Sequence, residues 1–255
     1  MPMRPARDVR THDAYLISGQ GIYEESSTQQ FELETRLQLG SRVFYYASAG
    51  EALYAGFGVQ QALVGGAGTT LQNTQAVTVA AAAGAKRIYV NALTTAQTAN
   101  VFAEGWAAVF DATTTGKCWL FKVKGNSALA TSGTASYIDL YDEIPEALTT
   151  SDQVSLIANP YKGTLLTNIS ADGGPLGVAP INVTSAYYFW LQTYGPAAVY
   201  PITSVGYGDS VVASDDTSGG LSANANVTLA AYPMGYCLHT GTANESAIVF
   251  LTMRA

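Results

Sequence analysis

A run of aromatic and aliphatic residues between positions 187 and 199 has the strongest strand pattern in the chain. Aromatic and β-branched residues favour a pleated strand, whose side chains point alternately to opposite faces. One face would carry Tyr187, Phe189 and Leu191, and the other would carry Tyr188, Trp190 and Gln192. Because both faces are mostly apolar, neither can face water. One face should therefore lie in the domain core, and the other should pack against a second sheet or another subunit.

The rest of the chain predicts short strands separated by turns rich in Gly, Thr and Asp. Gly195-Pro196 predicts a turn that ends the first strand, with residues 197–202 returning as a hairpin. Other strands are expected at residues 31–37, 42–46, 75–80, 87–92, 106–110, 117–123, 136–140, 153–158, 178–184, 199–203, 210–213, 234–239 and 247–253. Strands at this spacing are typical of a sandwich or barrel. We predict an all-β fold, with helix confined to a turn or two near Ala49 and Ala96.

The turns also predict how the chain is divided. Turn-rich sequence around residues 159–163 marks the main boundary between two packed β-sandwich or barrel-like units. The expected segments are an extended N-terminal arm at residues 1–30, a β-hairpin and linker at 31–70, a first β domain at 71–160 and a C-terminal β domain at 161–255.

The expected arm has its own composition. It carries Arg4, Arg7 and Arg10 together with two prolines, and it shows no apolar period. Such a segment is either a frayed terminus or an arm that becomes ordered on a partner. In the second case, its arginines would contact an acidic surface.

Charge narrows the classes of function. Charged residues make up 12% of the chain, about half the usual share, and the net charge is −7. Residues 163–253 contain five acidic residues and no Lys or Arg, whereas a nucleic-acid surface needs clustered cations. No apolar run is long enough to span a membrane, and the arginine-rich start lacks the apolar core of a secretory signal. We expect a protein made in the cytoplasm that binds neither nucleic acid nor membrane.

Ser210 is a weak candidate nucleophile. Gly208-Asp209-Ser210 is similar to the serine motif of one esterase class, and His239 is the one histidine in the C-terminal half. A serine nucleophile needs a base within hydrogen-bond reach and a group that orients the base. No helix is expected after Ser210 to supply an oxyanion hole. We therefore interpret Gly208-Asp209 as a β-turn and predict no enzyme activity.

Metal and cofactor sites are also not indicated. Cys118 and Cys237 lie in apolar runs, which favours two free buried thiols over a disulfide. A zinc site would need more ligands than these thiols, His12 and His239 supply. The acidic groups at residues 142–146 and 215–216 are expected to be solvated loop charge, with a weak calcium site as the alternative. The Gly-rich stretch at residues 63–70 lacks the lysine and the spacing of a phosphate loop.

Several segments together resemble the head decoration, or cement, proteins of tailed bacteriophages. Residues 175–196 carry most of the likeness, with Gly-Val-Ala-Pro followed by Tyr-Tyr-Phe-Trp-Leu-Gln-Thr-Tyr-Gly-Pro. Further patches lie at residues 33–50, 156–163, 206–209, 234–236 and 248–251. The resemblance implies a β-rich virion protein that binds the outer face of an assembled capsid, often as a trimer. Its expected partners are the major capsid protein and two further copies of itself, and it implies no catalytic residues.

The composition agrees with such a role. Low charge and 16 tyrosines suit a protein that meets neighbours through large contacts with polar tips. Tyr188, Trp190 and Tyr194 are the aromatic interface candidates, beside the three arginines of the arm. The main alternative is a phage tail-fibre or receptor-binding adhesin domain, which shares this composition but usually shows internal repeats. A β-sandwich carbohydrate-active enzyme would need convergent carboxylates and histidines, and a major capsid subunit would usually carry a long helix.

Overall fold

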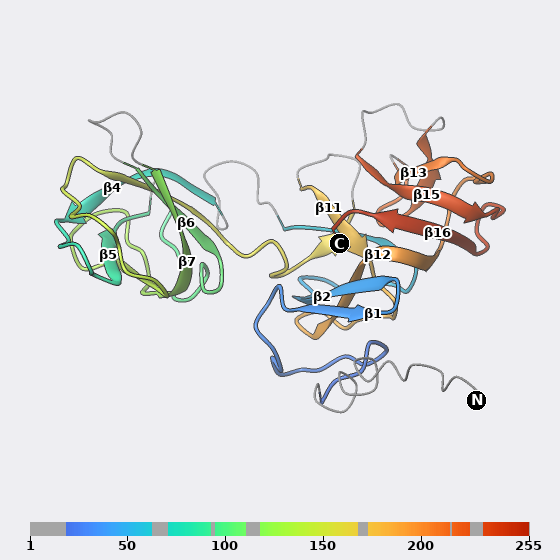
Figure 1. Ribbon diagram of the computed structural model, residues 1–255, viewed down its shortest axis with the longest axis horizontal. Coiled ribbons are helices and arrows are strands. Elements are labelled where there is room, and N and C mark those ends of the chain that lie inside the picture. The colour runs from blue at the N-terminus through green and yellow to red at the C-terminus, as the bar shows by residue number, and fades with distance from the viewer. Residues whose placement is uncertain are drawn as a thin grey trace, which may run out of the picture. The chain divides into compact units, whose positions relative to one another are not determined.

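The chain folds into two all-β units. The computed structural model describes residues 19–62, 71–92, 95–110, 118–167, 173–214, 216–224 and 232–254. One unit spans Leu63–Pro160, and the other combines Met1–Ala62 with Tyr161–Ala255 (Figure 1). The all-β prediction is confirmed. The helical turns expected near Ala49 and Ala96 are wrong, because both places form isolated β-bridges and turns instead.

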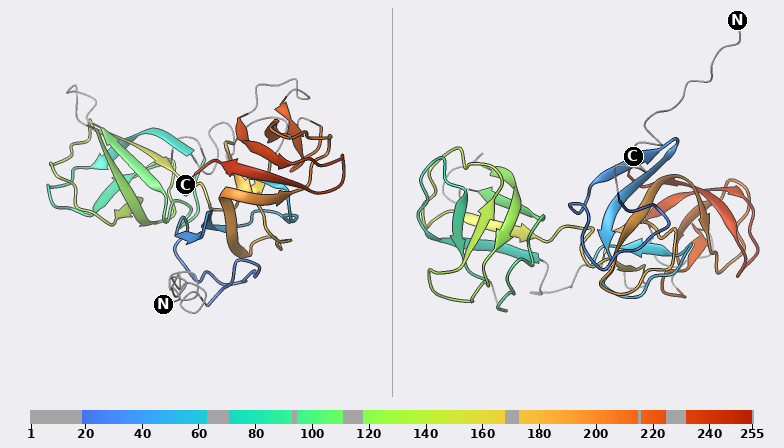
Figure 2. Two further views of the ribbon diagram at one scale, coloured as in Figure 1. Left: turned by 45° about the vertical axis from the view of Figure 1, so that its right-hand side comes forward. Right: turned by 90° about the horizontal axis from the view of Figure 1, so that it is seen from below.

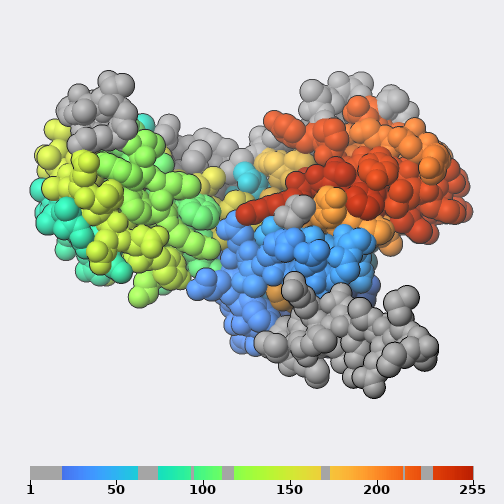
Figure 3. All heavy atoms as spheres, viewed as in Figure 1, coloured from blue at the N-terminus to red at the C-terminus, as the bar shows by residue number. Residues whose placement is uncertain are grey.

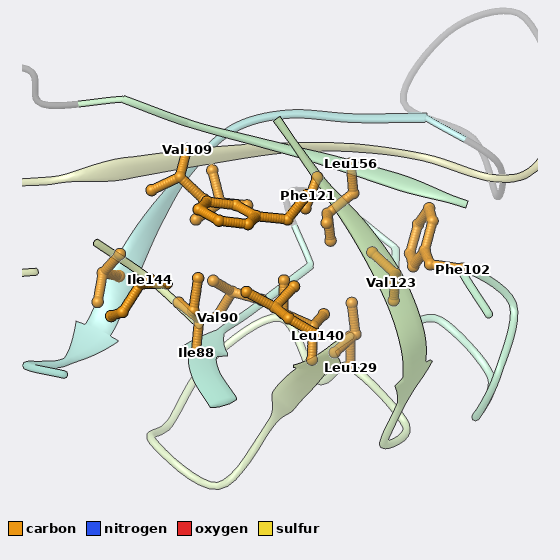
Figure 4. Close-up of a cluster of buried hydrophobic side chains, with 14 of the residues drawn as sticks. Ile88, Val90, Phe102, Val109, Phe121, Val123, Leu129, Leu140, Ile144 and Leu156 are labelled. Carbon is orange, nitrogen blue, oxygen red and sulfur yellow. The ribbon is translucent and has the colours of Figure 1, made fainter. Parts of the chain in front are cut away.

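The first unit is a closed antiparallel barrel. Its strands are β4 (Leu71–Val79), β5 (Arg87–Val90), β6 (Trp106–Phe110), β7 (Cys118–Asn126), β8 (Tyr137–Leu140) and β9 (Gln153–Ile157). They close in the order β4-β5-β8-β7-β6-β9. Alternate residues point inward from every side and form one apolar core, in which Val109, Phe121 and Leu140 meet (Figure 4). No described helix, here or in the second unit, is long and apolar enough to cross a membrane.

The second unit is built on a ten-stranded sheet that combines strands from the N-terminal part of the chain, blue to cyan in Figure 2, with strands from the C-terminal part, yellow to red. Its strands are β1 (Arg36–Leu39), β2 (Arg42–Ser48), β3 (Gly58–Gln60), β10 (Leu165–Leu166), β11 (Pro175–Val178), β12 (Tyr188–Val199), β13 (Ser210–Ala213), β14 (Leu221–Ala223), β15 (Pro233–His239) and β16 (Ala247–Thr252). The order is β10-β3-β11-β12-β16-β15-β13-β14, and the β1–β2 hairpin joins at β12. Residues 31–62, expected to form a hairpin and linker, therefore belong to the sheet of the C-terminal unit. Residues 63–70 lie outside the described residues.

Strand β12 holds this sheet together because it has different partners along its length. Residues 188–194 pair with β2, and residues 194–199 pair with β16. The expected turn at Gly195-Pro196 is wrong, since the strand runs straight through both residues. Gly195 has a φ of 85°, and a Cβ there would lie 2.3 Å from the Ser41 carbonyl oxygen. Glycine thus lets β12 change partners where the ends of β2 and β16 meet.

The two faces of β12 enter two separate apolar clusters, as the alternating pattern predicts. Phe189 and Leu191 belong to a cluster with Tyr45. Trp190 belongs to the other, packing against Tyr46 and the partly buried Phe31 with ring centroids 5.0 and 5.3 Å apart. Both faces are therefore covered by the same chain.

The cover over Trp190 comes from residues 20–33. The Trp190 indole N–H donates to the Gln20 carbonyl at 3.1 Å, and Gln20 Nε2 donates to the Tyr188 carbonyl at 2.9 Å. Ile22 and Leu33 are buried in the same cluster. The expectation that the whole of residues 1–30 becomes ordered only in an assembly is wrong for residues 19–30, because backbone and side-chain bonds fix them on β12. Residues 1–18, with Arg4, Arg7 and Arg10, lie outside the described residues.

We predict that Trp190→Ala lowers the free energy of unfolding by about 3–5 kcal/mol, the usual cost of emptying a large buried aromatic site. Trp190 is 2% exposed within a single chain, so the loss should appear in the isolated protein. Chemical denaturation measures it, and Trp190→Phe, which keeps a ring in place, should lose clearly less. If Trp190→Ala has the same free energy of unfolding as the wild type but no longer forms an oligomer, Trp190 lies in an intersubunit contact instead.

Candidate functional site

The outward-facing side of strands β12, β16 and β15 carries an apolar surface, which we call the outer face. Its residues are Tyr194, Ala198, Tyr236, Leu238, Ile248 and Phe250. The register pairs Ala198 with Ile248 and Tyr236 with Phe250. Ile248 and Tyr236 are 45% and 42% exposed, whereas the intervening Val249 and Cys237 are buried. Strand alternation thus exposes Tyr236 and Ile248 to solvent while their neighbours Cys237 and Val249 face the core.

An aromatic row crosses the middle of the outer face. Phe250 meets the edge of Tyr194 at a centroid distance of 5.2 Å and stacks on Tyr236 at 5.4 Å. These contacts fix the orientation of the rings before any partner arrives. Neither β15 nor β16 contains an acidic or basic residue apart from His239 at the end of β15. The C-terminal strands that carry the row form part of the surface in Figure 3, where they are red.

The aromatic interface candidates have three different positions in the structure. Trp190 is an internal core residue, so its assignment as an exposed interface anchor is corrected. Tyr188 is half-buried and stacks on Tyr46 at 6.0 Å. Tyr194 lies on the outer face, where it meets Phe250. Phe250 and Tyr236 were not among the residues expected at an interface, although the alternation Ile248, Phe250, Thr252 indicates an outer side with apolar residues.

Arg254 forms a cationic latch close to Tyr194, which packs against the same apolar cluster as Tyr45. Arg254 Nη1 donates to Glu34 Oε1 at 2.6 Å, and its guanidinium lies 4.7 Å from the centre of the Tyr45 ring. Tyr45 stacks on the buried Tyr161 at 5.2 Å, and the Arg254 carbonyl accepts from Thr193 Oγ1 at 2.6 Å. The chain's last described residue thus ties residues 34 and 45 to β12. Arg254 joins three separate segments of this unit through Glu34, Tyr45 and Thr193, which makes the latch a structural element.

Ser210 begins strand β13 directly after a tight turn. Gly206 N–H donates to Asp209 Oδ2 at 2.7 Å, and Gly208 has a φ of 82°, so residues 206–209 form a tight turn. Ser210 pairs with Tyr236 in the ladder, which puts His239 three residues further along β15. Asp209 is therefore occupied by its own turn, as expected for a turn that starts a strand.

The two cysteines are free, and one of them differs from expectation. Cys237 is buried, burial raises the pKa of its thiol, and its Sγ donates to the His239 carbonyl at 3.1 Å. Cys118 is exposed rather than buried, because it lies on the outer side of β7 with Leu120. Among the described residues, no group of three or more His, Cys, Asp or Glu side chains could hold a metal ion. His12, Asp215 and residues 63–70 lie outside them.

The barrel unit carries a shallow cationic pocket of about 450 Å³ around Lys86, Arg87 and Lys124. Arg87 is already paired with Asp139 at 2.7 Å and lies over the Tyr137 ring at 3.7 Å. Lys86 lies 3.9 Å from Glu143, and both are exposed. Glu143 is therefore a solvated charge in a loop, as expected. The pocket is a surface charge network rather than a built anion site.

Comparisons with known proteins add no family assignment: no protein-family model, no curated protein and no solved structure matches this chain.

We predict that the protein loses stability between about pH 10 and pH 12 through Tyr161. Burial raises the pKa of Tyr161 to about 12, although the neighbouring Arg254 lowers it. Above its ordinary pKa near 10, the hydroxyl ionises in the unfolded chain but not in the folded one, so stability falls as pH rises through this window. The stabilisation is fully present below pH 10. Denaturation at a series of pH values should show a shallower fall for Tyr161→Phe than for the matched surface variant Tyr207→Phe. Equal pH slopes in the two variants would contradict the assignment.

Proposed function

We propose that this chain is a structural protein of a tailed-phage virion that binds the outer surface of the capsid and stabilises it. The outer face is the observation that carries the proposal, because it is an apolar, preorganised surface. Large exposed apolar patches mark interaction sites. The sequence resemblance to decoration proteins supplies the class of partner, the major capsid protein. The proposal includes no catalytic role.

Charge supports a homotrimer that meets through the outer face. Each chain carries a net charge of −7, so two copies repel each other wherever their acidic surfaces approach. The uncharged strands β15 and β16 remove that repulsion at one place. Identical chains usually bury such a patch by closed cyclic symmetry. The row of Tyr194, Phe250 and Tyr236 would then form the centre of the subunit contact, and Arg4, Arg7 and Arg10 would contact the acidic shell.

Electron microscopy of particles purified together with this protein tests the proposed function. We expect extra density on the outside of the shell, at three-fold or quasi-three-fold positions. Deleting residues 1–18 should weaken capsid binding while the isolated protein stays folded, because the cover over Trp190 begins at Gln20. Density on the tail fibres would favour the adhesin instead, and density inside the shell would refute both.

The trimer contact is tested by Tyr236→Glu. A buried aromatic anchor contributes about 2 kcal/mol or more to an interface, and the new carboxylate adds repulsion between like-charged copies. Sedimentation should show a shift from trimer to folded monomer. The matched control is Leu120→Glu, which changes a 65% exposed residue on the barrel strand β7 and should leave the trimer intact. A Tyr236→Glu trimer as stable as the wild type, or a wild-type monomer, contradicts this contact.

A further inference from the structure

The hydrogen-bond ladder along one edge of β12 has a gap. Tyr194 pairs with Val43 at the end of β2, and the Tyr200 N–H donates to the Gly56 carbonyl at 3.0 Å. Residues 195–199 lie between these two points, and in the described part of the chain their strand partner is β16. The edge therefore closes at both ends and stays open in the middle.

Alternation shows which backbone groups face the gap. Successive residues of an antiparallel strand direct their N–H and C=O groups to opposite sides. Beyond the bulge between Gln192 and Tyr194, the Tyr200 N–H donates to Gly56 rather than to β16, so the even-numbered residues from Tyr194 to Tyr200 face away from β16. Pro196 fits such a position because it has no N–H to offer to β16. Its carbonyl already accepts from Gln192 Nε2 at 2.8 Å. This leaves the N–H and C=O groups of the exposed Ala198 directed at the gap.

A groove of about 370 Å³ runs along this edge. Residues 196–199 of β12 and Tyr200 line it together with residues 55–56, Val178 and Pro180. The volume is near the lower end of the range for ligand pockets, about 300–1,000 Å³. The groove thus combines space with the N–H and C=O groups of Ala198, which have no partner beside this edge in the described part of the chain.

Opposite charges stand at the two ends of the groove. Arg42 lies where β2 leaves β12, next to the Val43–Tyr194 pair, and Glu245 lies two residues before Ala247, the partner of Val199. Arg42 Nη1 donates to the Tyr23 hydroxyl at 3.3 Å, and the guanidinium lies 5.4 Å from the centre of the Phe44 ring. The ion pairs between described residues involve Lys86, Arg87 and Arg254, and none includes Arg42. Arg42 is thus held in place with no ion-pair partner among the described residues.

We propose that this groove binds an extended segment of another protein, about four or five residues long, that adds to the open edge of β12. The segment would exchange main-chain hydrogen bonds with Ala198 and place a carboxylate against Arg42. Adding a strand to an exposed edge is a common mode of peptide recognition, in which backbone bonds give affinity and side-chain contacts give specificity. Residues 195–199 span roughly 13 Å at about 3.3 Å per residue, which sets the length of the segment. A compact small molecule would not use both the backbone pair and the separated charges.

Selection from a displayed library of random seven-residue peptides on the full-length protein tests this inference. We expect enriched peptides that share an Asp or Glu at one fixed position. Arg42→Gln should weaken their binding about tenfold or more, because a charge-assisted bond to a carboxylate is lost. Ala198→Pro removes the one open-edge N–H without touching the bonds to β16, and it should weaken binding similarly. Ala198→Ser, which keeps the N–H, should bind like the wild type.

Changes in the peptide keep the test independent of protein folding. Methylation of the peptide nitrogen that donates to the Ala198 carbonyl should abolish binding, whereas methylation of the next nitrogen along should not. The inference is overturned if no peptide is enriched, if enriched peptides bind Arg42→Gln and wild type equally, or if every single methylation is tolerated. The result is separate from the capsid assignment, since particle density and peptide selection can each succeed while the other fails.

Discussion

The C-terminal unit depends on burying both faces of one strand. Trp190 and Phe189 are neighbours in β12 but belong to different apolar clusters. A strand with two apolar faces needs cover on both sides, and the chain provides it from distant segments. Residues 20–33 cover the Trp190 side, and the Tyr45–Tyr161 stack lies on the Phe189 side beneath Arg254. The segments at the two ends of the described chain are thus fixed by the same strand.

The partner exchange along β12 explains where the candidate sites lie. Once the strand passes Gly195 it leaves β2 and continues beside β16, so its outward side chains join those of β15 and β16 to make the outer face. The same departure opens the edge at Ala198, because β2 pairs with β12 no further than the Val43–Tyr194 pair. An apolar face and an unpaired edge therefore occur side by side. Both follow from one change of pairing, although they suit different kinds of contact.

Much of the fold follows from strand alternation, which predicted β6 and β13 with the bounds they have in the structure. The three-residue strands β3 and β14 are too short to show a period, and only pairing with distant strands creates them. Gly195-Pro196 has the local signature of a turn, but bonds to β16 hold it extended. The polar residues around Gln20 gave no signal that they cover Trp190, since they do so through hydrogen bonds rather than apolar packing. The outer face could be predicted from the alternation of Tyr236, Ile248 and Phe250 in the sequence. The open edge could not, because it depends on which strands pair with β12.

Hydrogen exchange, resolved by residue, tests most directly whether β12 is the protected centre of this unit. In the isolated monomer, the amides of residues 189–193 should be among the slowest to exchange, because exchange there requires opening both apolar clusters. The Ala198 amide, in the same strand, should exchange quickly. Rapid exchange throughout residues 189–193, at the rate of the turns, would contradict the account.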